Sequence, residues 1–215
     1  MICAGASGTQ WLANKYPDRD KNSIRKLTDC LYRTKIKKLV LISTIAVYPN
    51  PINVDEDTEI NSKELNSYGY NRLKLEQDLQ SIFDTTILRL PALYGQGLKK
   101  NVLFDLLNKQ HTEKINPMSS YQFYNLEKIS DDIDNALNLN LKLLNLSTAP
   151  LYIHELIDHC FDFKINFNKD NPQRREDMLS KFYNAYNKNS GYLYSKEEVL
   201  EDLKIFIKNY KLSRE

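Results

Sequence analysis

The sequence predicts an α/β protein in which helices alternate with the strands of a parallel sheet. Two apolar runs, at 38–43 and 85–90, lack a polar alternation, as strands buried on both faces do. A third short apolar segment stands at 2–5, and a helical pattern lies before each of the two later runs. Strand, helix and strand in alternation favour parallel pairing through right-handed crossovers.

The helices are predicted from the spacing of apolar side chains at about 3.6 residues. The first is expected at 23–35, with Asp20 or Asn22 as its N-cap. Further helices are expected at 67–83, 101–109, 130–139, 152–161 and from 195 onward, with a short strand at 143–146. The last helix begins with a capping box formed by Ser195 and Glu198. The side chains that it is expected to bury are Val199, Leu203, Phe206 and Tyr210.

The pattern of predicted strands and helices changes near residue 98. Strand and helix alternate before this point, whereas helical patterns dominate after it, and no internal repeat is visible. We therefore expect an α/β core over 1–98 and a smaller α-rich lobe over 99–215, interleaved with the core.

Composition limits the class of protein. The length of 215 residues is that of one domain, or of one with a small appendage. Thirty Lys+Arg against 28 Asp+Glu give a formal charge of +2, which argues against a dedicated nucleic-acid binder. Cys3, Cys30 and Cys160 are too far apart for a zinc knuckle, and we expect neither disulfides nor a metal site. With no apolar run of ~18 residues and no signal peptide, we expect a cytoplasmic protein without membrane or nucleic-acid partners.

Three side chains that can move a proton follow the predicted strands. Thr44 lies at the carboxyl end of the strand at 38–43, the edge at which open α/β sheets bind ligands. Tyr68 and Arg72 are four residues apart and therefore share a helix face. A cation beside a phenol stabilises the phenolate. Together the three predict a proton-transfer site for a sugar alcohol or ketone.

Each of these residues also has a purely structural interpretation. Thr44 could cap the strand end, and Tyr68 and Arg72 could form a solvated helix face. Arg89 lies within a predicted buried strand and is expected to be a buried structural partner rather than a ligand for substrate. Lys100 could simply lie in solvent.

Five motifs, in order along the chain, resemble those of one enzyme family. They are S-T-I-A-V-Y from Ser43, Y-G-Y-N-R-L-K-L-E from Tyr68, T-I-L-R-L-P-A-L-Y-G from Thr86, Y-Q-F-Y-N-L-E-K-I-S-D-D-I from Tyr121 and L-N-L-S-T-A-P-L-Y-I-H-E-L-I from Leu144. The set resembles the extended short-chain dehydrogenases/reductases and, within them, the NAD-dependent epimerase/dehydratase family that acts on nucleotide sugars. The resemblance implies a partial Rossmann-like parallel sheet whose N-terminal strands are missing, followed by a small substrate lobe.

The resemblance also implies roles for individual residues. Thr44 and Tyr68 stand at the catalytic positions, and Arg72 stands where the family usually has Lys. The positions implied for binding NAD or NADP are Ala4, Gly5, Ser43, Tyr68, Arg72 and Pro91. Those implied for a nucleotide-sugar substrate are Tyr94, Lys99, Lys100 and Asn101. The family also implies a possible homodimer and a role such as surface polysaccharide biosynthesis.

A second register is open, because Tyr70 and Lys74 also satisfy Y-x-x-x-K. Gly69, directly after Tyr68, and Glu76, at the family's later helix position, favour Tyr68.

Departures from the family pattern refine the expected reaction. Ile45 and Ala46 follow Thr44, where dehydratases carry Asp-Glu, so epimerisation or ketone reduction is favoured over dehydration. Arg in place of Lys keeps the charge but presents a larger planar fork, so the exchange at position 72 is not conservative.

The Gly-rich cofactor turn of the family is not recognised in this sequence. Gly5 and Gly8 resemble G-x-x-G-x-x-G, but Trp11 takes the third position and the segment fits the family's fourth strand better. On that alignment about 60 residues, two βα units and a strand, are absent. We therefore expect weak NAD binding, undetectable turnover and an apolar strand edge left open at 2–4. The alternative function is that of a non-catalytic relative, either a binding or interaction module or an incomplete reading frame.

Overall fold

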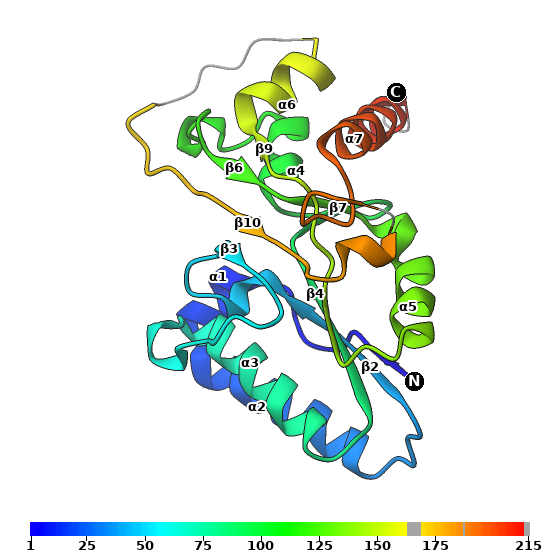
Figure 1. The fold of residues 1–215 in the computed structure, drawn as a ribbon. Coiled ribbons are helices and arrows are strands. Elements are labelled where there is room, and N and C mark those ends of the chain that lie inside the picture. The colour runs from blue at the N-terminus through cyan, green and yellow to red at the C-terminus, as the bar shows by residue number, and fades with distance from the viewer. Residues whose placement is uncertain (163–168, 187, 213–215) are drawn as a thin grey trace.

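The computed structural model describes residues 1–162, 169–186 and 188–212, and its core is a four-stranded parallel sheet (Figure 1). The strands lie in the order β1 (Ile2–Cys3), β2 (Leu39–Thr44), β4 (Thr85–Leu90) and β8 (Leu143–Asn145). All three pairings are parallel, and Leu41 of β2 lies opposite Ile87 of β4. The predicted α/β fold with a parallel sheet is confirmed.

Helices cover both faces of this sheet, which explains why its inner strands β2 and β4 bury residues on both faces. α2 (Pro17–Tyr32) and α3 (Ser67–Gln80) pack on one face, where Leu39 and Leu41 join their apolar side chains. α5 (Ile129–Asn138) packs on the other face, in a cluster that includes Val40. Successive residues of a strand point to opposite faces, so both sets are buried.

A second core lies beyond the carboxyl ends of the strands. It is built around α4 (Val102–Asn108), α6 (Ile153–Cys160) and α7 (Lys196–Leu212), in the upper part of Figure 1. The short strands of this region and of the loops leading to it are β3 (Ile52–Val54), β5 (Ala92–Tyr94), β6 (Ser120–Tyr121), β7 (Phe123–Asn125), β9 (Leu151–Tyr152) and β10 (Asp177–Met178). β3 pairs with β10 and thereby ties the core to the returning C-terminal segment.

The first helical region differs from the prediction. α2 starts at Pro17 instead of residue 23, and a short helix, α1 (Gln10–Lys15), precedes it. Proline suits the first helical position because the N–H that it lacks would have no partner there. Asp20 therefore lies inside α2 and is not its cap.

The later helices match their predicted ranges to within a few residues. The capping box of α7 is confirmed: the backbone N–H of Glu198 donates to Ser195 Oγ (3.3 Å), and the N–H of Ser195 donates to Glu198 Oε2 (2.7 Å). The most buried side chains of α7 are Val199, Leu203 and Ile207, while Phe206 is only partly buried.

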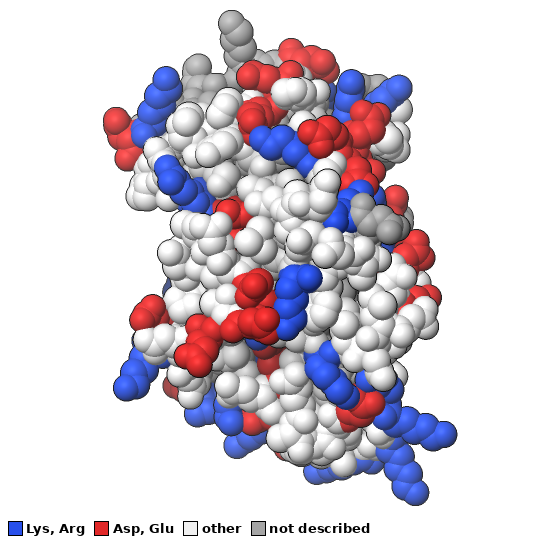
Figure 2. Space-filling view, viewed as in Figure 1, with Lys and Arg blue, Asp and Glu red and all other residues white. Residues whose placement is uncertain are grey.

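The surface carries no dominant charge on the side shown. Acidic and basic side chains are interspersed over this face (Figure 2). Among the described helices, none combines the length and the apolar character that a membrane span requires. The boundary predicted at residue 98 stays a prediction, although β8, from the second half, belongs to the core sheet.

Candidate active site

Thr44 is the last residue of β2 and lies at the carboxyl edge of the sheet. Its Oγ1 accepts the backbone N–H of Ala46 (3.2 Å) and so caps the 3₁₀ turn Ile45–Val47. This is the capping role considered for Thr44, but it engages only one acceptor position. The hydroxyl proton and a second lone pair can still serve a ligand.

The start of α3 packs tightly on that turn. The side chain of Asn66 caps the helix by accepting the N–H of Gly69 (3.0 Å). A Cβ at Gly69 would lie 2.2 Å from the carbonyl oxygen of Ala46, so only glycine permits this approach. The close contact brings the helix that carries Tyr68 against the segment that follows Thr44.

The structure separates the two registers. Tyr68 is 7 % exposed, and the Arg72 Cζ lies 4.5 Å from its ring centroid. Tyr70 is 47 % exposed, and Lys74 forms a surface ion pair with Asp78 (2.7 Å), which raises the pKa of the lysine. Tyr68 and Arg72 thus lie together inside the protein, while Tyr70 and Lys74 lie at its surface.

Arg72 has a buried partner that sequence reasoning missed. Its Nη1 and Nη2 donate to Oδ2 and Oδ1 of Asp20, each at 3.0 Å, and Nη2 also donates to the carbonyl of Ser7 (2.5 Å). Neither Arg72 nor Asp20 is a solvated surface residue, since both are buried. A signal for Asp20 exists in the sequence, because it shares a helix face with Ile24 and Leu27.

The residues implied for cofactor binding fall into two groups. Ala4 and Gly5 are exposed in the loop that follows β1, beside the Ser7 carbonyl that Arg72 binds. Ser43, in contrast, is buried, and its hydroxyl donates to Glu76. Pro91 is buried directly after β4. The structure places Ser43 in an internal network and leaves the loop at 4–9 open to solvent.

Arg89 organises that network and is the buried structural partner that was predicted. Its Nη2 donates to Oε2 of Glu76 (2.7 Å), and its Nη1 donates to the Tyr48 hydroxyl (2.7 Å). Burial opposes the charge of Arg89, but Glu76 and Tyr48 outweigh it and raise the pKa of the guanidinium. Burial raises the pKa of the Tyr48 phenol.

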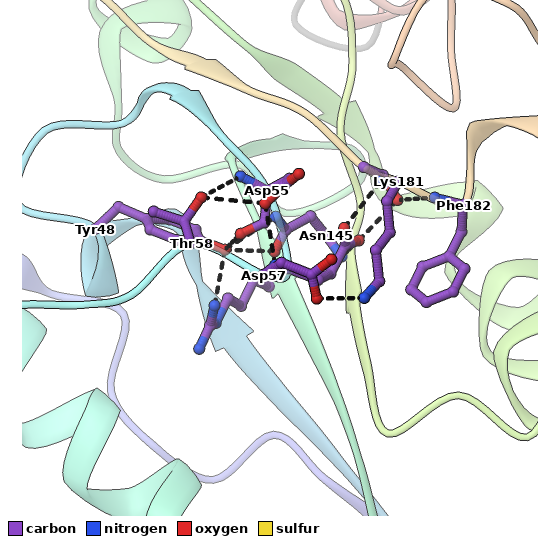
Figure 3. A network of polar contacts seen from close by, with 10 residues as sticks. Tyr48, Asp55, Asp57, Thr58, Asn145, Lys181 and Phe182 are labelled. Carbon is purple, nitrogen blue, oxygen red and sulfur yellow. Dashed lines mark hydrogen bonds and ion pairs between the residues drawn. The ribbon is translucent and has the colours of Figure 1, made fainter.

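Figure 3 shows how Tyr48 extends this network to the loop after β3. The Tyr48 hydroxyl donates to the carbonyl of Asp55 (2.7 Å) and accepts from Asn145 Nδ2 (3.0 Å). Asp57 and Lys181 form an ion pair across the same region. These bonds hold the 55–58 loop against the segment that enters the C-terminal lobe.

The four residues implied for substrate binding do not form one group. Tyr94 is 2 % exposed and packs on Phe206 with 5.3 Å between ring centroids, so its ring is part of the core of the lobe. Asn101 caps α4 by accepting the N–H of Phe104 (3.0 Å). These placements favour structural roles over substrate contact, because both side chains are already engaged.

Lys99 and Lys100 lie in an exposed loop. Lys100 Nζ donates to Thr9 Oγ1 (2.5 Å), which brings this loop to the one that follows β1. Burial lowers the pKa of Lys100. Of the four residues, the lysines alone combine a cation with solvent access.

A cavity that sequence reasoning did not locate lies between β3, β10 and β9. Its volume is about 190 Å³, and its lining residues are Ile52, Ser120, Pro150, Tyr152, Arg175, Glu176 and Asp177. Glu176 is buried, which raises the pKa of its carboxyl. The cavity thus offers a cation, acidic groups and an aromatic ring to a polar ligand.

Comparison with known proteins adds the family and the fold. The sequence profile of the NAD dependent epimerase/dehydratase family matches residues 1–145. No curated protein sequence matches the chain.

Solved structures with the same fold include a UDP-glucose 4-epimerase from Thermotoga maritima with UDP-glucose. The two sequences are 16 % identical, and the structures align with a TM-score of 0.73 over 100 % of this chain and 77 % of the epimerase chain. RMD from Pseudomonas aeruginosa, complexed with NADPH, has 14 % identity and a TM-score of 0.72 over 100 % and 80 % of the two chains. The NAD-dependent NDP-hexosamine 5,6-dehydratase TunA has 16 % identity and a TM-score of 0.67 over 93 % and 72 %. At such identities these likenesses show the fold alone. The family profile covers well over half of the chain, and the protein therefore belongs to the NAD-dependent epimerase/dehydratase family.

Proposed function

We propose that this protein acts on a nucleotide sugar with NAD or NADP, as an epimerase or ketone reductase, through Thr44, Tyr68 and Arg72. The observation that carries the proposal is the contact of Tyr68 with the buried Arg72 guanidinium, on a helix whose next residue, Gly69, packs on the turn that Thr44 caps. A phenol held beside a cation can exchange a proton with a sugar hydroxyl.

Each of the three residues has a distinct task in this mechanism. Tyr68 takes the proton from the sugar hydroxyl while the carbon that bears this hydroxyl is oxidised to a ketone. Tyr68 returns the proton when the ketone is reduced. Thr44 holds the same hydroxyl, with the lone pair and proton that Ala46 leaves unused. Arg72 stabilises the phenolate form of Tyr68, which must be present before Tyr68 can take the proton. The nicotinamide supplies a hydride acceptor and donor when it is bound.

The loop after β1 fits one end of such a cofactor. Ala4 and Gly5 are exposed there and carry at most a methyl group, so a flat ring can approach the backbone closely. Arg72 reaches this loop through the Ser7 carbonyl, and Pro91 follows strand β4, from which β1 is separated by β2. Ser43 is less suited, because its hydroxyl already donates to Glu76.

Two exposed cations support a phosphorylated substrate. Arg175 lines the cavity, and Lys100, in the loop before α4, bonds to Thr9 of the loop after β1; each offers a positive charge to a diphosphate. Structures of the same fold include complexes with UDP-glucose and with UDP-glucuronic acid, which favours a nucleoside diphosphate sugar here as well.

The turn after Thr44 argues for epimerisation or reduction. Ile45 is buried and Ala46 packs on Gly69, and neither side chain can protonate a leaving hydroxyl. Loss of water from the sugar would need an acid at this place.

The test compares two tyrosines on one helix. Wild type, Tyr68→Phe and Tyr70→Phe are each incubated with NAD or NADP and a panel of UDP-sugars, and the anomeric proton signals are followed by NMR. Tyr68→Phe should lower the rate of conversion by about 100-fold or more, whereas Tyr70→Phe should keep it within twofold. Conversion that survives in Tyr68→Phe but not in Tyr70→Phe would show that the second register operates.

A binding role without turnover is the second candidate. The ion pair with Asp20 favours it, because a neutralised Arg72 stabilises a phenolate less than a free cation would. Calorimetry separates the two candidates. Heat of binding for a UDP-sugar, with no conversion in any NMR assay, would support the binding module and overturn the enzymatic proposal.

A further inference from the structure

Asp20 occupies an unusual place for a carboxylate in the first turns of a helix. It is 8 % exposed, whereas Asp18, two residues earlier on α2, is exposed to solvent. An acidic residue near a helix N-terminus gains from the helix dipole while it remains hydrated. Asp20 gives up that hydration, so the buried carboxylate requires partners within the protein.

Those partners come from α3 and engage both carboxylate oxygens. Oδ1 accepts one bond from Arg72 at 3.0 Å, and Oδ2 accepts from Arg72 at 3.0 Å and from Asn71 Nδ2 at 2.9 Å. The pairing with Arg72 is therefore bidentate, which fixes the plane of the guanidinium as well as its position.

Arg72 in turn joins three segments of the protein. Its polar edge faces Asp20 of α2 and the Ser7 carbonyl of the loop after β1, while its carbon lies 4.5 Å from the Tyr68 ring centroid on α3. A guanidinium that turned about its own axis would lose the Ser7 bond. Among the described residues, the carboxylate of Asp20 alone accepts from both of its terminal nitrogens.

We propose that Asp20 is a positioning residue of the site: its carboxylate orients Arg72 so that one cation lies against both Tyr68 and the loop at 4–9. The functional part of this proposal rests on the proposed function. Asp20 also accounts for arginine at position 72, since an ammonium cannot make two in-plane bonds to a carboxylate and a third to Ser7 with the same geometry.

The side-chain NMR signals of Arg72 report its orientation without any ligand. Bidentate pairing should hinder rotation of the guanidinium and keep the Nη signals resolved, and the Tyr68 ring should shift the Arg72 Hδ signals upfield. The signals are assigned by their loss in Arg72→Lys. Asp20→Asn should merge the Nη signals and reduce the upfield shift by at least half. Asp29→Asn, an exposed carboxylate on the same helix, is the matched control and should change neither.

If Asp20→Asn fails to fold, Asp20→Glu gives the answer, because it keeps the charge but displaces the carboxylate by one methylene. It should fold and still lose the resolved Nη signals. Wild-type Nη and Hδ signals in a folded Asp20→Asn protein would overturn the proposal, as would wild-type signals in Asp20→Glu.

Kinetic measurements test whether the orientation of Arg72 by Asp20 affects the reaction. Asp20→Asn should lower kcat about tenfold and leave the KM for the nucleotide sugar within twofold of wild type. Equal effects on kcat of Asp20→Asn and Asp29→Asn would overturn the positioning role. If wild type shows no conversion while the Arg72 signals respond as expected, the proposed function fails and the orientation of Arg72 by Asp20 stands.

Discussion

Two arginines are buried in the part of the chain that the structure describes, and each is held by a carboxylate in a different way. Arg89 lies near the carboxyl end of the inner strand β4, where Glu76 and Tyr48 bind its guanidinium. Arg72 lies on α3 at the edge of the sheet, between Asp20 and an exposed loop. The first guanidinium is enclosed by the fold, whereas the second lies next to residues that a ligand can reach.

The difference shows why burial of a charge does not by itself mark a functional site. Arg89 stabilises the arrangement of core and lobe through Tyr48, and its environment raises the pKa of the guanidinium. Arg72 pairs just as closely with a carboxylate, but its third partner is a carbonyl in the loop after β1. What separates them is the solvent access of their neighbours.

Removal of Glu76 should have the largest effect, because it leaves Arg89 charged in the protein interior. Glu76→Ala should lower the free energy of unfolding by about 3–5 kcal/mol, measured by urea denaturation. Glu59→Ala, at an exposed glutamate, is the control and should change it by less than about 0.5 kcal/mol. A loss in Glu76→Ala as small as that of the control would mean that Arg89 finds water or another partner.

A double substitution sharpens this result. Glu76→Leu with Arg89→Met removes both charges and should recover most of the stability lost in Glu76→Ala, because apolar side chains of similar size need no partner.

The Arg72 region depends on a close backbone approach that the Arg89 region lacks. Gly69→Ala would place its Cβ 2.2 Å from the carbonyl of Ala46, so α3 must move away from the turn after Thr44. We expect a loss of about 1–3 kcal/mol in the free energy of unfolding, together with loss of conversion. Gly8→Ala is the control, since nothing lies within 4 Å of its added Cβ. Equal activity in the two variants would contradict the contact.

Asp132 provides a buried carboxylate whose hydrogen bonds come from tyrosines. Tyr124 and Tyr194 donate to it, the latter at 2.9 Å, and burial raises the pKa of its carboxyl. A raised pKa means that the native state keeps this proton to a higher pH than the unfolded chain does. Stability from this group is thus complete below the unfolded pKa of about 3.9 and falls as the pH rises through the native pKa.

Asp132→Asn should remove that dependence. Above about pH 4, the free energy of unfolding of wild type should fall relative to that of the variant by up to about 1.4 kcal/mol per pH unit. Urea denaturation of both proteins across pH 4–7 measures this difference. Parallel curves for the two proteins would show that Asp132 titrates alike in the native and unfolded states.

Lys100 should give the smallest effect on stability. It bonds to Thr9 in the loop that Arg72 also contacts, but it does so at the surface. Lys100→Ala should change the free energy of unfolding by less than about 0.5 kcal/mol. A larger loss in urea denaturation would show that the lysine stabilises the loop as a buried group does.

Local patterns were sufficient to predict the sheet and one contact of the site. The apolar runs at 38–43 and 85–90 predicted parallel strands, and the four-residue spacing predicted the contact of Tyr68 with Arg72. Both features depend on residues that are close in sequence, so the order of apolar and polar residues along the chain is enough to predict them.

Long-range pairing could not be predicted in the same way. Asp20 and Arg72 come from different helices, and Ser43 meets Glu76 only when α3 packs on the sheet. The ring of Tyr94 entered the core of the lobe because α7, at the far end of the chain, supplies Phe206. Such contacts depend on how the helices are placed in three dimensions, which no local spacing encodes.

The position of β8 has a consequence for how the protein is made. β4 ends at Leu90 and its sheet neighbour β8 starts at Leu143, with α4 and α5 between them. At a synthesis rate of about 5–20 residues per second, a ribosome needs roughly 3 to 10 s to supply the missing strand. During that interval the apolar edge of β4 stays open on the nascent chain. Translation speed and chaperone access over this stretch should therefore decide the yield of folded protein.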